Sequence, residues 1–132
     1  MMRKPTVLDA ETERFASIVV DCAYVVHRET GPGLLESVYE KCLAWEIASR
    51  GLKVLRQAVR PIEYRGHRID DALRIDLLVE DRIIVEVKAV HDMEPIFKTQ
   101  LATYLKLSRL RLGFLINFNR TLIKDGIERI IV

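Results

Sequence analysis

Two short apolar runs separated by three charged residues constrain the fold of this chain more than any other stretch. Residues 74–79 and 83–90 are rich in isoleucine, leucine and valine, and a charged turn of three residues joins them. This pattern predicts a β-hairpin with Val79 opposite Ile83. Side chains alternate between the two faces of a strand, so one face is expected to be wholly apolar and to cover a core. That face holds Ile75, Leu77, Val79, Ile83, Val85, Val87 and Ala89.

The opposite face of the predicted hairpin carries charged side chains among apolar ones. Asp76 falls opposite Glu86, and Lys88 follows on the same face. Two facing carboxylates repel, so each raises the pKa of the other unless a cation lies between them. A divalent metal ion explains the pair. An ordinary ion pair between Lys88 and one carboxylate, on a solvated sheet face, is an alternative of equal weight.

The periodicity of the remaining sequence predicts an α/β fold with a mixed sheet. Apolar residues at three- and four-residue spacing predict helices over residues 11–28, about 34–50, and 95 to about 110. Strands are expected at 53–59 and 62–64, with a bulge or edge at Pro61 and a turn at 65–67, then at 112–118 and, as an edge strand, 127–132. The last helix is expected to cross over the sheet and to turn inward Ile96, Phe97, Leu101, Tyr104, Leu105 and Leu107 or Ser108.

Length and composition narrow the class of protein. A chain of 132 residues predicts one domain, residues 1–132. Two cysteines without a CxxC motif indicate neither a disulfide framework nor a zinc site. No run of eighteen apolar residues and no secretory segment over residues 1–15 are found, so no membrane partner and a cytoplasmic location are expected.

Charge is unevenly distributed although the net charge is only +2. Residues 63–94 contain nine acidic and five basic residues, a local charge of −4, whereas residues 95–124 contain six basic residues and no acidic one. An acidic metal centre followed by a basic helix and strand suits a polyanion held over a cation. A solvated helix face accounts for the basic residues equally well.

Several motifs occur together in one order along the chain. Gly33, Glu36 and Tyr39 stand in GLLESVY, Asp76 precedes the Glu86-Val87-Lys88 triplet, Gln100 and Tyr104 stand in QLATY, and LINFN and KDGI occupy residues 115–119 and 124–127. With these motifs the chain resembles the GxxExxY proteins of the PD-(D/E)xK nuclease superfamily, some of whose members carry a RecB-like QxxxY motif. The resemblance implies a restriction-endonuclease-like mixed β-sheet flanked by helices. It departs from the superfamily name at Ile75, where a proline would stand.

The resemblance also implies a function, that of a metal-dependent nuclease that hydrolyses phosphodiester bonds of DNA or RNA. Asp76, Glu86 and the carbonyl group of Val87 would bind Mg²⁺ or Mn²⁺, with Glu36 as a further ligand directly or through water. Lys88 would orient or deprotonate the attacking water and neutralise charge on the phosphate. Gln100 would position the lysine, the water or a phosphate, and Tyr104 would pack beside it.

Two further classes of function fit the same fold. One is a non-catalytic nucleic-acid-binding module, in which the phosphates are held by Lys98, Lys106, Arg109 and Arg111. The other is a protein-interaction module, including a homodimer formed by pairing of the C-terminal edge strand.

Overall fold

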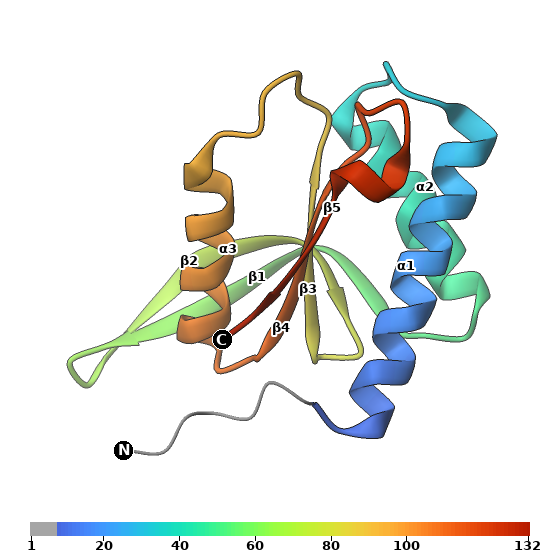
Figure 1. The fold of residues 1–132 in the computed structure, drawn as a ribbon. Coiled ribbons are helices and arrows are strands. Elements are labelled where there is room, and N and C mark those ends of the chain that lie inside the picture. The colour runs from blue at the N-terminus through green and yellow to red at the C-terminus, as the bar shows by residue number, and fades with distance from the viewer. Residues whose placement is uncertain (1–7) are drawn as a thin grey trace.

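A computed structural model describes residues 8–132 and shows, over that range, a five-stranded mixed sheet with helices on both faces (Figure 1). Helices α1 and α2 cover one face, and helix α3 covers the other. The strands lie in the order β1-β2-β3-β4-β5. The elements are α1 (Ala10–Thr30), α2 (Glu36–Ser49), β1 (Val54–Tyr64), β2 (His67–Val79), β3 (Ile83–Lys88), α3 (Pro95–Ser108), β4 (Leu112–Asn117), the 3₁₀ helix η1 (Ile123–Gly126) and β5 (Ile127–Ile131).

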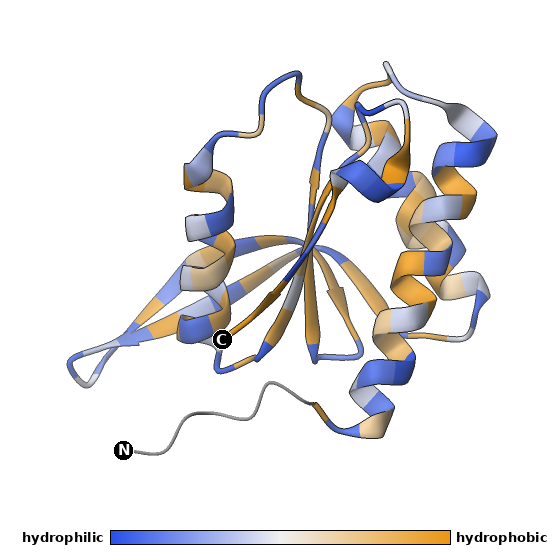
Figure 2. Cartoon of the chain, in the orientation of Figure 1, coloured by the Kyte–Doolittle hydropathy of each residue, from blue (hydrophilic) through white to orange (hydrophobic). Residues whose placement is uncertain are grey.

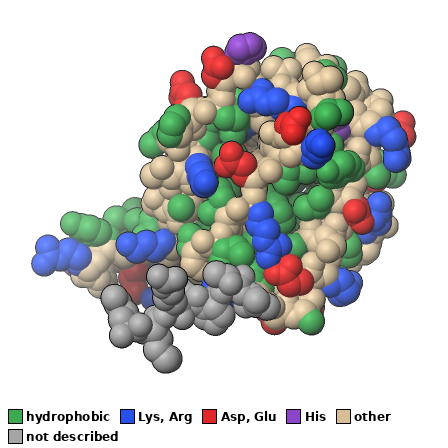
Figure 3. Space-filling model, viewed as in Figure 1, with side chains coloured by type: hydrophobic (Ala, Val, Ile, Leu, Met, Phe, Trp, Pro, Cys, Tyr) green, Lys and Arg blue, Asp and Glu red, His purple; other side chains and the backbone are tan. Residues whose placement is uncertain are grey.

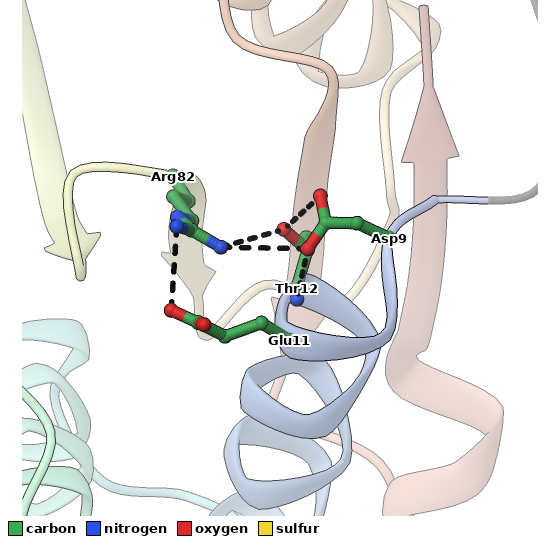
Figure 4. A network of polar contacts seen from close by, with 4 residues as sticks. All are labelled: Asp9, Glu11, Thr12 and Arg82. Carbon is green, nitrogen blue, oxygen red and sulfur yellow. Dashed lines mark hydrogen bonds and ion pairs between the residues drawn. The ribbon is translucent and has the colours of Figure 1, made fainter.

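Helix α1 begins at a side-chain cap that also ties it to the central hairpin. Asp9 accepts hydrogen bonds from the backbone N–H of Thr12 at 2.8 Å and from its hydroxyl at 2.9 Å. Arg82, in the turn between β2 and β3, lies 3.4 Å from Asp9 and 3.3 Å from Glu11 (Figure 4). The start of α1 and the hairpin turn are therefore held together.

The predicted register of the central hairpin is confirmed. Strands β2 and β3 pair antiparallel with Val79 opposite Ile83 and Leu77 opposite Val85. The turn is closed by a hydrogen bond of 2.9 Å from the N–H of Arg82 to the carbonyl of Val79. Extending this register by one position brings Asp76 to the level of Glu86.

Two apolar cores lie on the two faces of the sheet, and apolar residues are concentrated along its strands (Figure 2). The predicted apolar face of the hairpin packs against α1 and α2, with one exception. Ile75 was expected on that face, but it packs under α3 with Leu78 and Ile84, so this prediction is wrong. The residues confirmed on the α1 and α2 face are Leu77, Val79, Ile83, Val85 and Val87, with Ala89 packed beside them.

The exception at Ile75 arises from an irregular position in the neighbouring strand. Strand β1 pairs Arg56 with Leu77 and Ala58 with Ile75, but Gln57 has no paired Cα partner. Gln57 adopts a φ of 51°, in the left-handed region that β-strands do not use. The strict two-residue alternation assumed from the sequence therefore fails on either side of Asp76.

The β1–β2 hairpin is longer than predicted. Strand β2 begins at His67, whereas a turn through residue 67 and a strand starting at residue 74 were expected. The first half of β2 is polar and exposed, so it has no apolar alternation to mark it, yet its backbone pairs with β1. The irregularity predicted at Pro61 is confirmed, because the register shifts between Arg60 and Ile62. The hairpin projects beyond the body of the sheet (Figure 1).

Helix α3 connects two parallel strands, as predicted. Strand β4 is buried along its whole length and pairs parallel to β3. Leu101 and Leu105 of α3 are fully buried, but the expected inward position of Ile96 is wrong, since it is 59% exposed. Ile96 lies one residue, or about 100° around the helix, away from the buried stripe. Of the two alternatives at the end of the stripe, Ser108 is partly buried and Leu107 is 38% exposed.

Strand β5 is the edge strand predicted at the C-terminal end, paired antiparallel to β4. None of the helices in residues 8–132 is both long and apolar enough to cross a membrane. The expected lack of a secretory segment concerns residues 1–15, of which the first seven lie outside the described residues.

Gly126 provides a test of how closely η1 packs on the end of β4. A Cβ atom built at Gly126 would lie 2.1 Å from the carbonyl oxygen of Asn117. We expect Gly126→Ala to lower the free energy of unfolding by about 1–3 kcal/mol, because backbone must move to admit the methyl group. Urea denaturation followed by circular dichroism measures the change. Lys124→Ala, an exposed substitution in the same 3₁₀ helix, should change stability by less than about 0.5 kcal/mol.

Candidate functional site

Two carboxylates from neighbouring strands form the centre of the candidate site. Asp76 Oδ2 accepts a hydrogen bond of 2.9 Å from the backbone N–H of Val87, next to Glu86 on β3. Glu86 is 6% exposed, and its Oε1 atom has no hydrogen-bond partner in the described part of the chain. Burial first, and the neighbouring charge of Asp76 second, raise the pKa of Glu86 to about 9.

Lys88 lies two residues beyond Glu86 and therefore projects from the same face of β3. Its Nζ atom is 4.4 Å from the centre of the Phe97 ring at the start of α3. The positive charge of Lys88 acts against burial and lowers the pKa of Glu86, although burial has the larger effect. Lys88 is therefore the cation facing the two carboxylates from β3.

Asp76 is also reached by a chain of side chains from β1 and α2. Gln57 Nε2 lies 3.4 Å from Asp76 Oδ1 and 2.5 Å from Glu40 Oε1. Arg56 Nη2 completes the chain with an ion pair of 3.0 Å to Glu40 Oε2. Because Glu40 is buried, these two hydrogen bonds satisfy a carboxylate that would otherwise be costly to bury. Gln57, which lies between Asp76 and Glu40, is the residue of β1 with the left-handed backbone conformation described above.

Sequence reasoning missed Glu40, Gln57 and Arg56. One signal for Glu40 was available, since it follows Glu36 by four residues and therefore lies on the same side of α2. No comparable signal marks Gln57, because a polar residue in an alternating strand reads as a solvent-facing position. Only the irregular pairing of β1 with β2 reveals it.

Glu36 is the first residue of α2, at the end of the helix nearest the two carboxylates. Its side chain is largely open to solvent, but partial burial raises its pKa. The charge of Lys88 opposes that shift and the charge of Asp76 adds to it, so Glu36 interacts electrostatically with both. Its predicted role as a metal ligand stays a prediction.

Tyr39 fastens the loop that leads into Glu36. Its ring is fully buried and stacks on Phe118, with centroids 4.7 Å apart and planes 7° from parallel. Its hydroxyl donates to the carbonyl of Gly31 at 2.6 Å and accepts from the N–H of Leu34 at 3.0 Å. The tyrosine of the GLLESVY motif is therefore a positioning residue that holds both ends of the loop before Glu36.

The segment after Lys88 is held by a fully buried amide at the end of β4. Asn117 Oδ1 accepts from the N–H of Val90 at 3.1 Å, and its Nδ2 donates to the carbonyl of Val90 at 2.9 Å. Arg120 adds a hydrogen bond of 3.1 Å to the carbonyl of His91. The LINFN segment, noticed in the sequence only as part of the resemblance, thus positions the chain just after Lys88.

Gln100 and Tyr104 on α3 have different surroundings. Gln100 is exposed, and its side chain makes no hydrogen bond within residues 8–132. Tyr104 is partly buried and packs against the core between α3 and the sheet. A contact of either side chain with Lys88 or with a phosphate stays a prediction.

The four predicted phosphate-binding cations are spread along α3 and the start of β4. Lys98, Lys106 and Arg109 are exposed, and Arg111 Nε donates to the carbonyl of Val132 at 3.2 Å. Lys98 and Arg109 are separated by about 16 Å along a helix that rises 1.5 Å per residue. On the face shown in Figure 3, acidic and basic side chains are interspersed, and basic ones gather on the projecting hairpin.

The carboxylates fit a hard divalent cation better than a softer one. In the described part of the chain, no group of three or more His, Cys, Asp or Glu side chains lies close enough to hold a metal ion. Asp76 and Glu86 nevertheless supply two adjacent oxygen donors, and Glu86 Oε1 is a buried polar atom without a partner. Mg²⁺ is commonly held by one or two carboxylates together with water and substrate phosphates.

Comparison with known proteins gives one match. The sequence profile of the PD-(D/E)XK nuclease superfamily matches residues 13–130. No curated protein and no solved structure is detectably similar to the chain.

The hydroxyl of Tyr39 gives a first prediction for the site. We expect Tyr39→Phe to lower the free energy of unfolding by about 1 kcal/mol, because the Gly31 carbonyl and the Leu34 N–H each lose a partner. Amide hydrogen exchange should also become faster in residues 31–35. Tyr24→Phe is the matched control, since Tyr24 is 45% exposed. Equal stability and equal exchange in the two variants would contradict the positioning role.

The raised pKa of Glu86 predicts how stability changes with pH. Below pH 4.5 the carboxyl group is protonated in both the folded and the unfolded chain. Between pH 4.5 and about 9 it ionises in the unfolded chain but not in the folded one, so the metal-free protein should lose stability as pH rises. Glu86→Gln replaces the ionisable carboxyl group by a neutral amide. We expect the free energy of unfolding of this variant, relative to that of the wild type, to rise by at least about 1 kcal/mol across that window.

Urea denaturation at pH 5 and pH 8 in the presence of EDTA measures this difference. Exposed Glu128→Gln on β5 is the matched control and should show no such pH dependence. A stability difference between Glu86→Gln and the wild type that stays constant from pH 5 to pH 8 would show that Glu86 is ionised in the folded protein.

Proposed function

The chain belongs to the PD-(D/E)XK nuclease superfamily, and on that premise we propose that it is a divalent-metal-dependent nuclease that hydrolyses phosphodiester bonds of DNA or RNA. The observation that carries the proposal is the buried, unpartnered Oε1 atom of Glu86 beside Asp76. In a purely structural role this arrangement is unfavourable, because a buried carboxyl group with a raised pKa destabilises the fold at neutral pH. A bound cation would remove that cost.

In this proposal the cation is Mg²⁺ or Mn²⁺, held by Asp76, Glu86 and the carbonyl group of Val87. The hydrogen bond from the Val87 N–H fixes one oxygen of Asp76, and the chain through Gln57 to Glu40 fixes the other. Glu36 supplies a further oxygen, directly or through water. When bound, such an ion lowers the pKa of a coordinated water and polarises the phosphate.

Lys88 acts in this proposal on the reacting phosphate and the attacking water. The water oxygen forms a bond to phosphorus, and the bond from phosphorus to the leaving oxygen breaks. Lys88 orients the water and neutralises negative charge that grows on the phosphate oxygens. Its proximity to Phe97 restricts the ammonium group to one region, which favours this role over a freely solvated lysine.

Exposed side chains of α3 serve substrate binding in this proposal. Gln100 contacts the lysine, the water or a phosphate, and Tyr104 packs beside it. Lys98 lies one residue after Phe97, so it is the cation of α3 nearest Lys88 in sequence. Lys106, Arg109 and Arg111 contact phosphates farther along the nucleic acid. Assignment to the GxxExxY group rests on Gly33, Glu36 and Tyr39 and is part of the proposal.

Cleavage of labelled nucleic acid tests the proposed function. We expect the wild-type protein to cut single- or double-stranded DNA or RNA with Mg²⁺ or Mn²⁺ and to lose this activity in EDTA. Asp76→Asn and Lys88→Met should each lower the rate by about 10²-fold or more, because each removes a group that acts on the reacting atoms. Lys124→Met, an exposed lysine on η1, is the matched control and should retain full activity.

The same experiment separates catalysis from binding. Binding that weakens steeply with salt, together with no metal-dependent cleavage of any substrate, would favour a nucleic-acid-binding module instead. Equal cleavage by the wild type and both site variants would assign the activity to a contaminant and contradict the proposal.

A further inference from the structure

Helix α2 is apolar on two sides, although only one side is covered. Its buried side packs into the core through Tyr39, Leu43, Ala44 and Ile47. On the other side Val38 is 37% and Trp45 is 69% exposed, and Leu35, just before the helix, is 73% exposed. Single exposed apolar residues are common on protein surfaces, but a row of them on one helix marks an interaction surface.

The exposed residues follow a spacing typical of helix pairing. Leu35, Val38 and Trp45 are exposed, and Cys42, which is partly buried against the main core, lies between them. The four residues are separated by three, four and three residues, which places them along one seam of the helix. We call these four residues the α2 seam. The seam continues into a groove of about 300 Å³ between α1 and α2, bordered by Val26, Cys42 and Trp45. A helix packed along the seam would therefore contact both the seam side chains and the adjacent groove.

We propose that the α2 seam binds the α2 seam of a second copy of this chain, with the two helices parallel. The charges that flank the seam favour this occupant. Lys41 directly precedes Cys42 of the seam, and Glu46 directly follows Trp45. Glu46 therefore lies five residues after Lys41 in the chain. In a parallel pair these positions face each other across the seam, so Lys41 of each copy lies beside Glu46 of the other.

The opposite orientation is disfavoured by the same two charges. In an antiparallel pair centred on this seam, Lys41 faces Lys41 and Glu46 faces Glu46, and like charges repel. The charges beside the seam are therefore complementary only when the two helices are parallel. Trp45 adds a large apolar ring of the kind enriched at protein interfaces.

The proposed pairing is independent of the proposed nuclease activity. It places the starts of the two α2 helices, and with them the two Glu36 side chains, at the same end of the dimer. It also differs from pairing through the edge strand β5, which stays a separate prediction.

Sedimentation equilibrium over a range of protein concentrations tests the proposal. We expect the wild-type chain to form a dimer and Trp45→Glu to be monomeric at every concentration. Leu122→Glu is the matched control, since Leu122 is 53% exposed but lies outside the seam, and it should dimerise like the wild type. Trp45 is the only tryptophan, so its fluorescence should shift to shorter wavelength as the wild type associates. A wild type that is monomeric throughout, or a Trp45→Glu variant that still dimerises, would overturn the proposal.

A charge exchange tests the orientation. Lys41→Glu should weaken the dimer at least several-fold, and the double variant Lys41→Glu/Glu46→Lys should restore it, because the swapped charges again face each other. If Lys41→Glu leaves association unchanged, the parallel arrangement is wrong, because in an antiparallel pair position 41 faces position 41 and the substitution only exchanges one like-charge repulsion for another. Far-ultraviolet circular dichroism checks that each variant is folded.

Disulfide cross-linking tests the pairing in the wild-type protein, without a substitution that could destabilise the fold. In a parallel pair the two Cys42 side chains are neighbours in the seam, so diamide, which accepts the two thiol hydrogens, should convert the dimer to a disulfide-linked form. Cys42→Ser should abolish this product, whereas Cys22→Ser should not, because Cys22 is fully buried. No Cys42-linked dimer under conditions where the wild type is dimeric would contradict the seam.

Discussion

The register of the β2–β3 hairpin is the constraint on which the candidate site depends. A three-residue turn pairs Val79 with Ile83, and the pairs as far as Leu77 with Val85 follow from it. A shift of one residue would turn the whole apolar set away from α1 and α2 and bring the charged residues into the core. The apolar packing on one face thus holds Asp76 and Glu86 beside each other on the other.

The surrounding elements stabilise this pair in positions that the hairpin alone cannot maintain. Tyr39 fastens the loop before Glu36, and Asn117 fastens the segment after Lys88. The two meet through the stacked rings of Tyr39 and Phe118, since Phe118 follows Asn117 directly. The start of α2 and the end of β3 are therefore held in one connected set of contacts.

Buried charge at the centre of the site has a cost that function explains. Burial and the charge of Asp76 both raise the pKa of Glu86, so its protonated form is favoured when no cation is bound. A bound cation would reverse that preference and stabilise the folded chain. The chain belongs to the PD-(D/E)XK nuclease superfamily, and the proposed metal-dependent chemistry and its substrate are for the experiments described above to decide.

Local pattern in the sequence was sufficient for most of the helices and strands and for the register that brings Asp76 near Glu86. Helix periodicity, the charged turn and the buried run of β4 each depend on residues close together in the chain, and their predictions were confirmed. Tertiary structure alone decided the rest. Ile75 changed faces because Gln57, in another strand, is irregular, and Glu40 joined the site because α2 packs beside that irregularity. The sequence also did not reveal the exposure of the α2 seam, because an apolar residue in a helix gives the same pattern whether it faces a core or solvent. These outcomes depend on which surfaces meet, and short-range pattern carries no information about that.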